Sequence, residues 1–224
     1  MKFEFPFLSG KTGNAEGVAG DEGQLVVGGL HGKYYEVNQK YGMFMSSCTP
    51  LGLAIPIYTA TALAGGMPLW NPAGSGVVAV LTKYQAAHAS GTAAVFVAGL
   101  MARNGMGSVI GTGTQITAFA ETVPINGKLG LVNSIGGAGG GLASKVKSSN
   151  AGTVTITAGV AGEWVETIFG TGIEAAATAN GITRVDHDFD GRIEVYPGTM
   201  VWIGATLASV ALYGQSLGWY ERPL

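Results

Sequence analysis

Residues 192–205 read RIEVYPGTMVWIGA, and this stretch decides the class of fold. Polar and apolar side chains alternate from Arg192 to Tyr196, which is the pattern of a strand with one buried and one solvated face. Pro197 and Gly198 then form a turn signal. The run that follows, 199–205, is apolar and contains the residue types that favour strands. The stretch therefore predicts two successive strands joined by a tight turn.

The same signals recur along the whole chain. Strands are expected at 24–30, 33–37, 42–47, 52–58, 77–82, 93–99, 108–121, 128–133, 153–160, 163–170, 181–187, 192–197, 199–205 and 206–214. Helical periodicity is limited to 172–181 and 82–90, which could form one or two short helices. Because these segments are short and do not alternate with the strands, the pattern argues against a parallel α/β sheet. We predict an all-β fold, an antiparallel β-sandwich or a jelly-roll-like structure.

The chain is predicted to hold one large domain, since all-β domains of this length are often single. Residues 1–23 are polar and Gly-rich and are expected to form an extended N-terminal arm, followed by the β domain at 24–224. A Gly- and Ser-rich stretch at 134–152 is expected to be a loop, and it could subdivide the domain.

The composition excludes several classes of function. Charged residues make up 12% of the chain, with 12 Lys and Arg against 14 Asp and Glu, whereas an ordinary soluble domain has about 25%. The sequence contains no basic patch that would indicate nucleic acid binding. Prolines and glycines interrupt the apolar run 41–82, so no membrane-spanning helix is expected. Cys48 is the single cysteine, which excludes an intrachain disulfide and suits a reducing compartment.

One catalytic motif occurs near the end of the sequence. Gly214–Gly218 reads GQSLG, which matches the nucleophile elbow of serine hydrolases and would make Ser216 the nucleophile. An elbow needs a helix after the serine and a later histidine, and WYERPL provides neither. Asp186 and His187 precede the serine, which is the wrong order for that fold. We interpret Ser216 as part of a twisted final strand; a hydrolase with Ser216 as its nucleophile is a further hypothesis.

A candidate cation site lies at DHDFDG, residues 186–191. Asp186, Asp188 and Asp190 occupy the first, third and fifth places of a calcium loop, but Pro197 stands where the bidentate glutamate belongs. We interpret the segment as a hairpin with an Asp-Gly turn. The three aspartates remain the candidate for weak cation binding.

No other group of residues predicts chemistry. His31, His88 and His187 lack zinc-ligand spacing. Four tryptophans lie in or beside the expected strands and are interpreted as core or interface residues: Trp70, Trp164, Trp202 and Trp219. We therefore expect no catalytic residue, no cofactor and no enzymatic activity.

The uncharged stretches predict a role in assembly. No charged residue occurs at 41–82, 104–120 or 148–162. A monomer normally stays soluble through a mixed charged exterior, whereas the cores of subunit interfaces are depleted of charge. We therefore expect a homo-oligomer or a component of a larger shell.

Four segments resemble β-rich virion proteins of tailed bacteriophages. They are GKYYEVNQKYGMFMSS (32–47), LGLAIPIYTATALAGGMPLWNPAGSGVVAVL (51–81), PGTMVWIGA (197–205) and GWYERPL (218–224). The resemblance implies a jelly-roll-like structural protein of the particle: a capsid decoration (cement) protein, a head fibre or a minor capsid protein. Its expected partners are copies of itself, with a trimer favoured, and other virion proteins such as the major capsid protein. Nucleic acid and membrane are not expected partners. Its expected location is the virion, assembled in the host cytoplasm.

The alternative is a tail-fibre or spike module that binds a host glycan. In that case Trp219, Tyr220 or the loop 134–152 would face the ligand.

Overall fold

The computed structural model describes residues 34–92, 95–126, 143–150, 153–159, 162–171 and 184–224. The chain divides into two units, residues 1–41 and 42–224. The predicted arm at 1–23 and the predicted strands at 24–30 and 128–133 lie outside the described residues, as does the predicted helix at 172–181.

In the first unit, the described residues form the helix α1 (Tyr35–Lys40). The strand predicted at 33–37 is therefore wrong from Tyr35 onward. The amide of Tyr41 donates to the carbonyl oxygen of Val37, which closes the last helical turn. Gly42 follows with φ 78°, a left-handed conformation that commonly ends a helix. Tyr and Val favour strands in general, but this glycine was the local stop signal for a helix.

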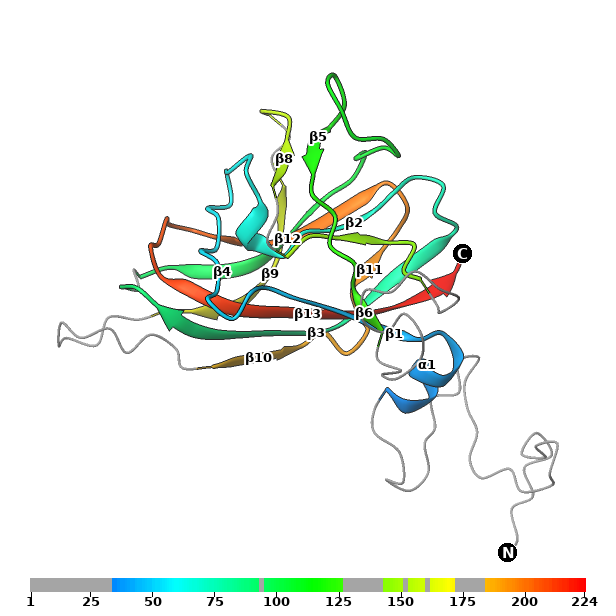
Figure 1. Ribbon diagram of the computed structural model, residues 1–224, viewed down its shortest axis with the longest axis horizontal. Helices are drawn as coiled ribbons and strands as arrows, with labels where there is room; N and C mark the ends of the chain where they lie inside the picture. Colours follow the sequence, from blue (N-terminus) through cyan, green and yellow to red (C-terminus); the bar gives the residue numbers. More distant parts are fainter. Residues whose placement is uncertain (1–33, 93–94, 127–142, 151–152, 160–161, 172–183) are drawn as a thin grey trace, which may run out of the picture. The chain divides into compact units, whose positions relative to one another are not determined.

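The second unit is an antiparallel β-sandwich, which confirms the predicted all-β class (Figure 1). The first sheet has the order β10-β3-β13-β1-β6, and β11 also pairs with β3. Its strands are β1 (Met43–Ser47), β3 (Val77–Ser90), β6 (Ile125–Asn126), β10 (Val185–Asp188), β11 (Glu194–Val195) and β13 (Leu212–Pro223). The second sheet has the order β7-β2-β12-β4-β9. Its strands are β2 (Leu69–Asn71), β4 (Val97–Arg103), β7 (Lys147–Ser148), β9 (Glu163–Gly170) and β12 (Thr199–Ala205).

The longest pairing joins β3 and β13 in the middle of the first sheet. It extends from Leu212 opposite Ser90 to Pro223 opposite Val77. The short helix predicted at 82–90 is wrong, because these residues are the second half of β3. Their alanines favour a helix in isolation, but Tyr84 and Ala86 are buried at strand spacing. Tertiary pairing overrides the local preference here.

The main core lies between the two sheets. Trp219 and Phe44 stack there with ring centroids 6.0 Å apart. A second apolar cluster covers the other face of the second sheet, where Trp70 and Trp202 pack under a small two-stranded sheet. This small sheet consists of β5 (Ile116–Phe119) and β8 (Val154–Ile156), which lie above β12 in Figure 1. In the described part of the chain, no helix has the length and apolar character needed to span a bilayer.

Several predicted strands have other bounds. Residues 52–58 form only isolated bridges, at Leu53 with Tyr213 and at Ile57 with Ala205, and Pro56 offers no amide for a regular ladder. The short 3₁₀ turn η2 (Ala64–Gly66) follows. The segment predicted at 206–214 enters its strand only at Leu212, and the one predicted at 108–121 shortens to β5. Within the predicted loop 134–152, Lys147 and Ser148 instead pair with β2.

Candidate interaction surface

One end of the sandwich is built from chain segments without charged side chains. No Asp, Glu, Lys or Arg occurs between Lys40 and Lys83, between Lys83 and Arg103, or between Glu194 and Glu221. Parts of these three runs meet at the end where β3 leads into β4 and β12 leads into β13 (Figure 1). We call this surface the uncharged end and define it as residues 49–62, 91–92, 95–97 and 205–213.

Backbone hydrogen bonds fix the three segments to one another. The amide of Tyr58 donates to the carbonyl oxygen of Ala205 at 2.8 Å. Thr206 and Val97 exchange two bonds, one through the threonine hydroxyl, at 2.9 and 3.0 Å. Leu53 and Tyr213 exchange a further pair. The uncharged end is therefore one continuous surface made from distant parts of the sequence.

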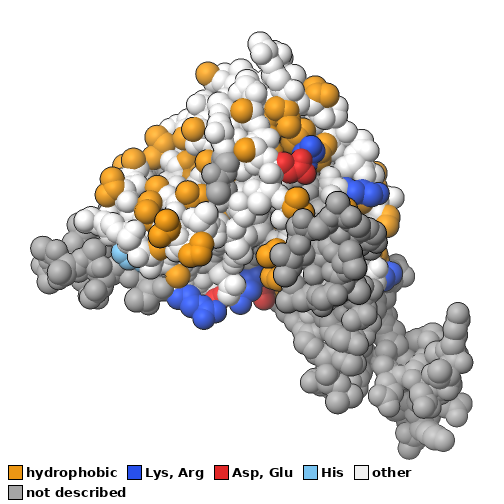
Figure 2. Space-filling view, viewed as in Figure 1, with side chains coloured by type: hydrophobic (Ala, Val, Ile, Leu, Met, Phe, Trp, Pro, Cys, Tyr) orange, Lys and Arg blue, Asp and Glu red, His pale blue; other side chains and the backbone are white. Residues whose placement is uncertain are grey.

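Large apolar side chains are exposed on this surface. Their exposed fractions are 79% for Leu51, 76% for Val210, 58% for Leu207, 44% for Tyr58, 43% for Val95 and 38% for Val97. Figure 2 shows orange side chains along the left flank, where no blue or red is visible above the lower edge. A clustered apolar exposure of this kind marks a protein or membrane contact more often than an inert surface.

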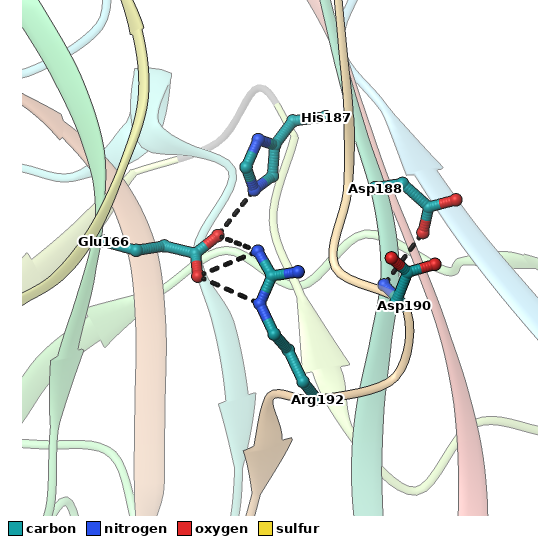
Figure 3. Close-up of polar contacts among 5 residues, drawn as sticks. All are labelled: Glu166, His187, Asp188, Asp190 and Arg192. Carbon is teal, nitrogen blue, oxygen red and sulfur yellow. Dashed lines mark hydrogen bonds and ion pairs between the residues drawn. The ribbon is translucent and has the colours of Figure 1, made fainter.

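The charged side chains that the structure describes lie outside this set of residues, although Arg184 borders it beside Thr49 and Pro50. Several of them form ion pairs. Glu166, on the edge strand β9, accepts from Arg192 at 3.0 and 3.1 Å and lies 2.5 Å from Nε2 of His187 (Figure 3). His187 belongs to β10, at the edge of the other sheet. The cluster thus links the two sheets along one open side of the sandwich, which is a structural role.

The three candidate cation ligands have other partners. Asp186 forms ion pairs with Lys83 at 3.0 Å and with Arg184 at 2.8 Å. Hydrogen bonds from Gln85 and then Lys83 lower the pKa of the Asp186 carboxyl. Asp188 accepts from the amide of Asp190 at 2.8 Å. Among the described residues, no group of three or more His, Cys, Asp or Glu side chains is placed to hold a metal ion.

The Asp-Gly turn is present, but the predicted hairpin is wrong. Asp190 and Gly191 both have positive φ, 55° and 73°, and the amide of Arg192 donates to the carbonyl oxygen of Phe189. This is the turn that Asp-Gly favours. However, β10 and β11 do not pair with each other, since both pair with β3. β10 and β11 therefore lie one after the other along the same side of β3, and the turn bulges out between them.

Ser216 lies within β13, between Ser47 on one side and Gln85 on the other. Its hydroxyl group lies 3.4 Å from Oε1 of Gln85. The strand continues to Pro223, so no helix follows the serine. The strand–turn–helix geometry of a nucleophile elbow is absent at this position.

A cleft of about 970 Å³ opens between the sheets beside Arg192. Its apolar floor includes Leu100, Val201 and Ile193. On its rim, Glu194 accepts from Arg222 at 2.9 Å and from the hydroxyl of Tyr196 at 2.8 Å. The hydrogen bond from Arg222 is the largest cause of the lowered pKa of Glu194. The Glu194 carboxylate on the rim of the cleft is thus held ionised and paired, which does not suit a general acid.

Three of the four tryptophans lie in the core, one of the two locations predicted for them. Trp70, Trp202 and Trp219 are at most 1% exposed, whereas Trp164 is 38% exposed. Trp219 and Tyr220 are both buried, so the expectation that they face a glycan is wrong. Residues 134–142 and 151–152 of the other predicted ligand segment lie outside the described residues.

No protein-family model, curated protein or solved structure matches this chain. The resemblance to bacteriophage virion proteins therefore stays a prediction.

The sequence reasoning identified only part of the uncharged end. It noted the run 41–82 but not the runs 84–102 and 195–220, which are equally free of Asp, Glu, Lys and Arg. Measuring the distance in sequence between successive charged residues along the whole chain would have found them. What it could not find is that the three runs meet.

Proposed function

We propose that this protein is a structural component of a bacteriophage particle, a capsid decoration, head-fibre or minor capsid protein. The observation that supports this proposal is the uncharged end, where six large apolar side chains are exposed among described residues that carry no charge. Such a surface is costly for a free monomer, and it has the composition of a subunit interface core. Its function is then to hold subunits together.

The proposal includes the partners implied by the resemblance to virion proteins. These are copies of the same chain, with a trimer favoured, and neighbouring proteins such as the major capsid protein. Assembly would take place in the host cytoplasm, where the thiol of Cys48 stays reduced.

The test is to locate the chain in purified particles. Antibodies against the recombinant protein are used on density-purified particles of the phage that encodes it, followed by cryo-electron microscopy. We expect many copies in regular positions on the head. Detection in the lysate but not in particles would contradict the proposal.

A second candidate function is recognition of a host glycan. The observation in its favour is that Trp164 and Tyr196, 38% and 51% exposed, line two hollows that share Ala102, Asn104 and Val165. Exposed aromatic rings can stack on sugar rings. A glycan array with the wild type and the Trp164→Ala variant tests this candidate: binding that is lost in the variant supports it, and no binding by either protein contradicts it.

A further inference from the structure

We infer that the uncharged end is the surface on which a second copy of this chain binds. This inference rests on the proposed structural function and names the partner of the surface described above. It is argued from charge, from the packing beneath the surface and from the position of its most exposed side chains.

The distribution of charge favours a copy of the same chain. In a cyclic homo-oligomer, surfaces close to the symmetry axis face their own copies, so any charge there meets a like charge. An interface of this kind is tolerated best where the surface carries no charge at all. The uncharged end meets this condition over all three of its segments.

The same observation makes other occupants less suitable. A different protein partner is usually selected by complementary charge, and this surface offers none. A peripheral membrane site usually combines exposed apolar residues with Lys or Arg at its border. At the uncharged end, Arg184 borders Thr49 and Pro50, but it is already paired with Asp186 at 2.8 Å, and none of the exposed apolar residues lies next to it in sequence.

The backbone beneath the surface is closely packed at Gly91. A Cβ atom on Gly91 would lie 2.7 Å from the carbonyl oxygen of Val210, and Gly91 has φ 84°. The main chain at 91 therefore packs directly against the loop that carries Leu207 and Val210. Beneath the surface, the ring of Tyr213 contacts those of Phe96 and Phe169, with centroids 5.9 and 6.1 Å apart. A surface that is ordered in advance loses little entropy on association.

Val210 is the best position for a test, because its side chain is 76% exposed. A charge placed there need not disturb the core. Val210→Glu introduces a carboxylate that would be desolvated or would face its own copy in the assembly. Val123→Glu is the matched control, since Val123 is 66% exposed and lies on the segment that hydrogen-bonds to β7.

The experiment is sedimentation velocity on the full chain from 1 to 100 µM. We expect the wild type and Val123→Glu to associate, and Val210→Glu to associate at least about ten-fold more weakly. Thermal unfolding followed by circular dichroism checks that the variants are folded. If the uncharged end faces its own copies, mixing Val210→Glu with Val210→Lys or Leu51→Lys restores association, because opposite charges then meet.

Three results would overturn the inference. These are a wild type that is monomeric at 100 µM, equal association of Val210→Glu and Val123→Glu, and no recovery in either charge-reversed mixture. Absence of recovery in the mixtures would mean that the uncharged end does not face its own copies and that a different surface or molecule binds there. A monomer that is still found in particles refutes this inference alone, whereas an oligomer absent from particles refutes the proposed function alone.

Discussion

The hydroxyl of Tyr84 donates a hydrogen bond of 2.9 Å to Oε1 of Gln215, and both side chains are buried. The two residues lie on β3 and β13, the central pair of the first sheet. The amide nitrogen of Gln215 continues the network to the carbonyl oxygen of Gly65 at 2.9 Å. Burial raises the pKa of Tyr84 well above its ordinary value, so the phenol stays protonated as a donor.

Removal of this hydroxyl should destabilise the fold. Tyr84→Phe leaves the buried amide oxygen of Gln215 without its donor, which we expect to lower the free energy of unfolding by about 1–3 kcal/mol. Urea denaturation measures the change. Tyr58→Phe is the control, because Tyr58 is 44% exposed, and it should shift the midpoint very little. Equal effects of the two variants would contradict the assigned role of the network.

Asn71 is a second buried polar residue whose side chain joins strands of the two sheets. Its side-chain nitrogen donates to the carbonyl oxygens of Val77 at 2.9 Å and Val195 at 2.8 Å, so it ties β2 to β3 and β11. Asn71→Ala leaves two buried carbonyl groups without this donor, and we expect a loss of about 3 kcal/mol. Ser75→Ala removes a part-buried hydroxyl that donates to Oδ1 of Asn71 and has only long contacts of 3.4 Å with the amide nitrogen and carbonyl oxygen of Val77, so it should cost less. Denaturant unfolding of both variants checks the order, and a larger loss for Ser75→Ala would refute it.

Close packing of a glycine against Trp202 gives a third prediction. A Cβ atom on Gly162 would lie 2.3 Å from the ring of this buried tryptophan. Gly162→Ala should therefore displace the ring and destabilise the protein by about 1–3 kcal/mol, as overpacked cores do. At Gly170 the nearest atom lies 3.7 Å away, so Gly170→Ala serves as the matched control. Thermal unfolding with near-ultraviolet circular dichroism distinguishes them. An unchanged tryptophan signal together with an unchanged midpoint in Gly162→Ala would contradict the expected displacement of the ring.

The paired carboxylate Glu194 predicts a pH dependence of stability. Its pKa in the folded chain lies below its ordinary value of 4.5, chiefly through the hydrogen bond from Arg222. A lowered folded-state pKa gives stability that is present above pH 4.5 and is lost as the pH falls through the folded-state pKa. We expect Glu194→Gln to lose less stability than the wild type between pH 5 and 3. Urea midpoints at several pH values test this, and parallel curves would contradict it.

The sequence predicted the strands where the apolar pattern alone decides the structure. The predicted strand 199–205 coincides with β12, and 163–170 coincides with β9. The prediction failed at 82–90, because the partner that makes these residues a strand, β13, lies more than a hundred residues further along the chain. At the uncharged end, the absence of charge is visible in the sequence. The contacts that bring Tyr58 to Ala205 and Val97 to Thr206 depend on the topology of two sheets, which no local pattern encodes.

The position of β13 has a consequence for synthesis. This strand lies between β3 and β1, yet it is made after every other described strand. On the ribosome, β1 and β3 therefore cannot pair with their common neighbour until residues 212–223 have been translated and have left the exit tunnel. The loop with Leu207 and Val210 emerges just before it, so a nascent chain cannot present a finished contact surface to other polypeptides early.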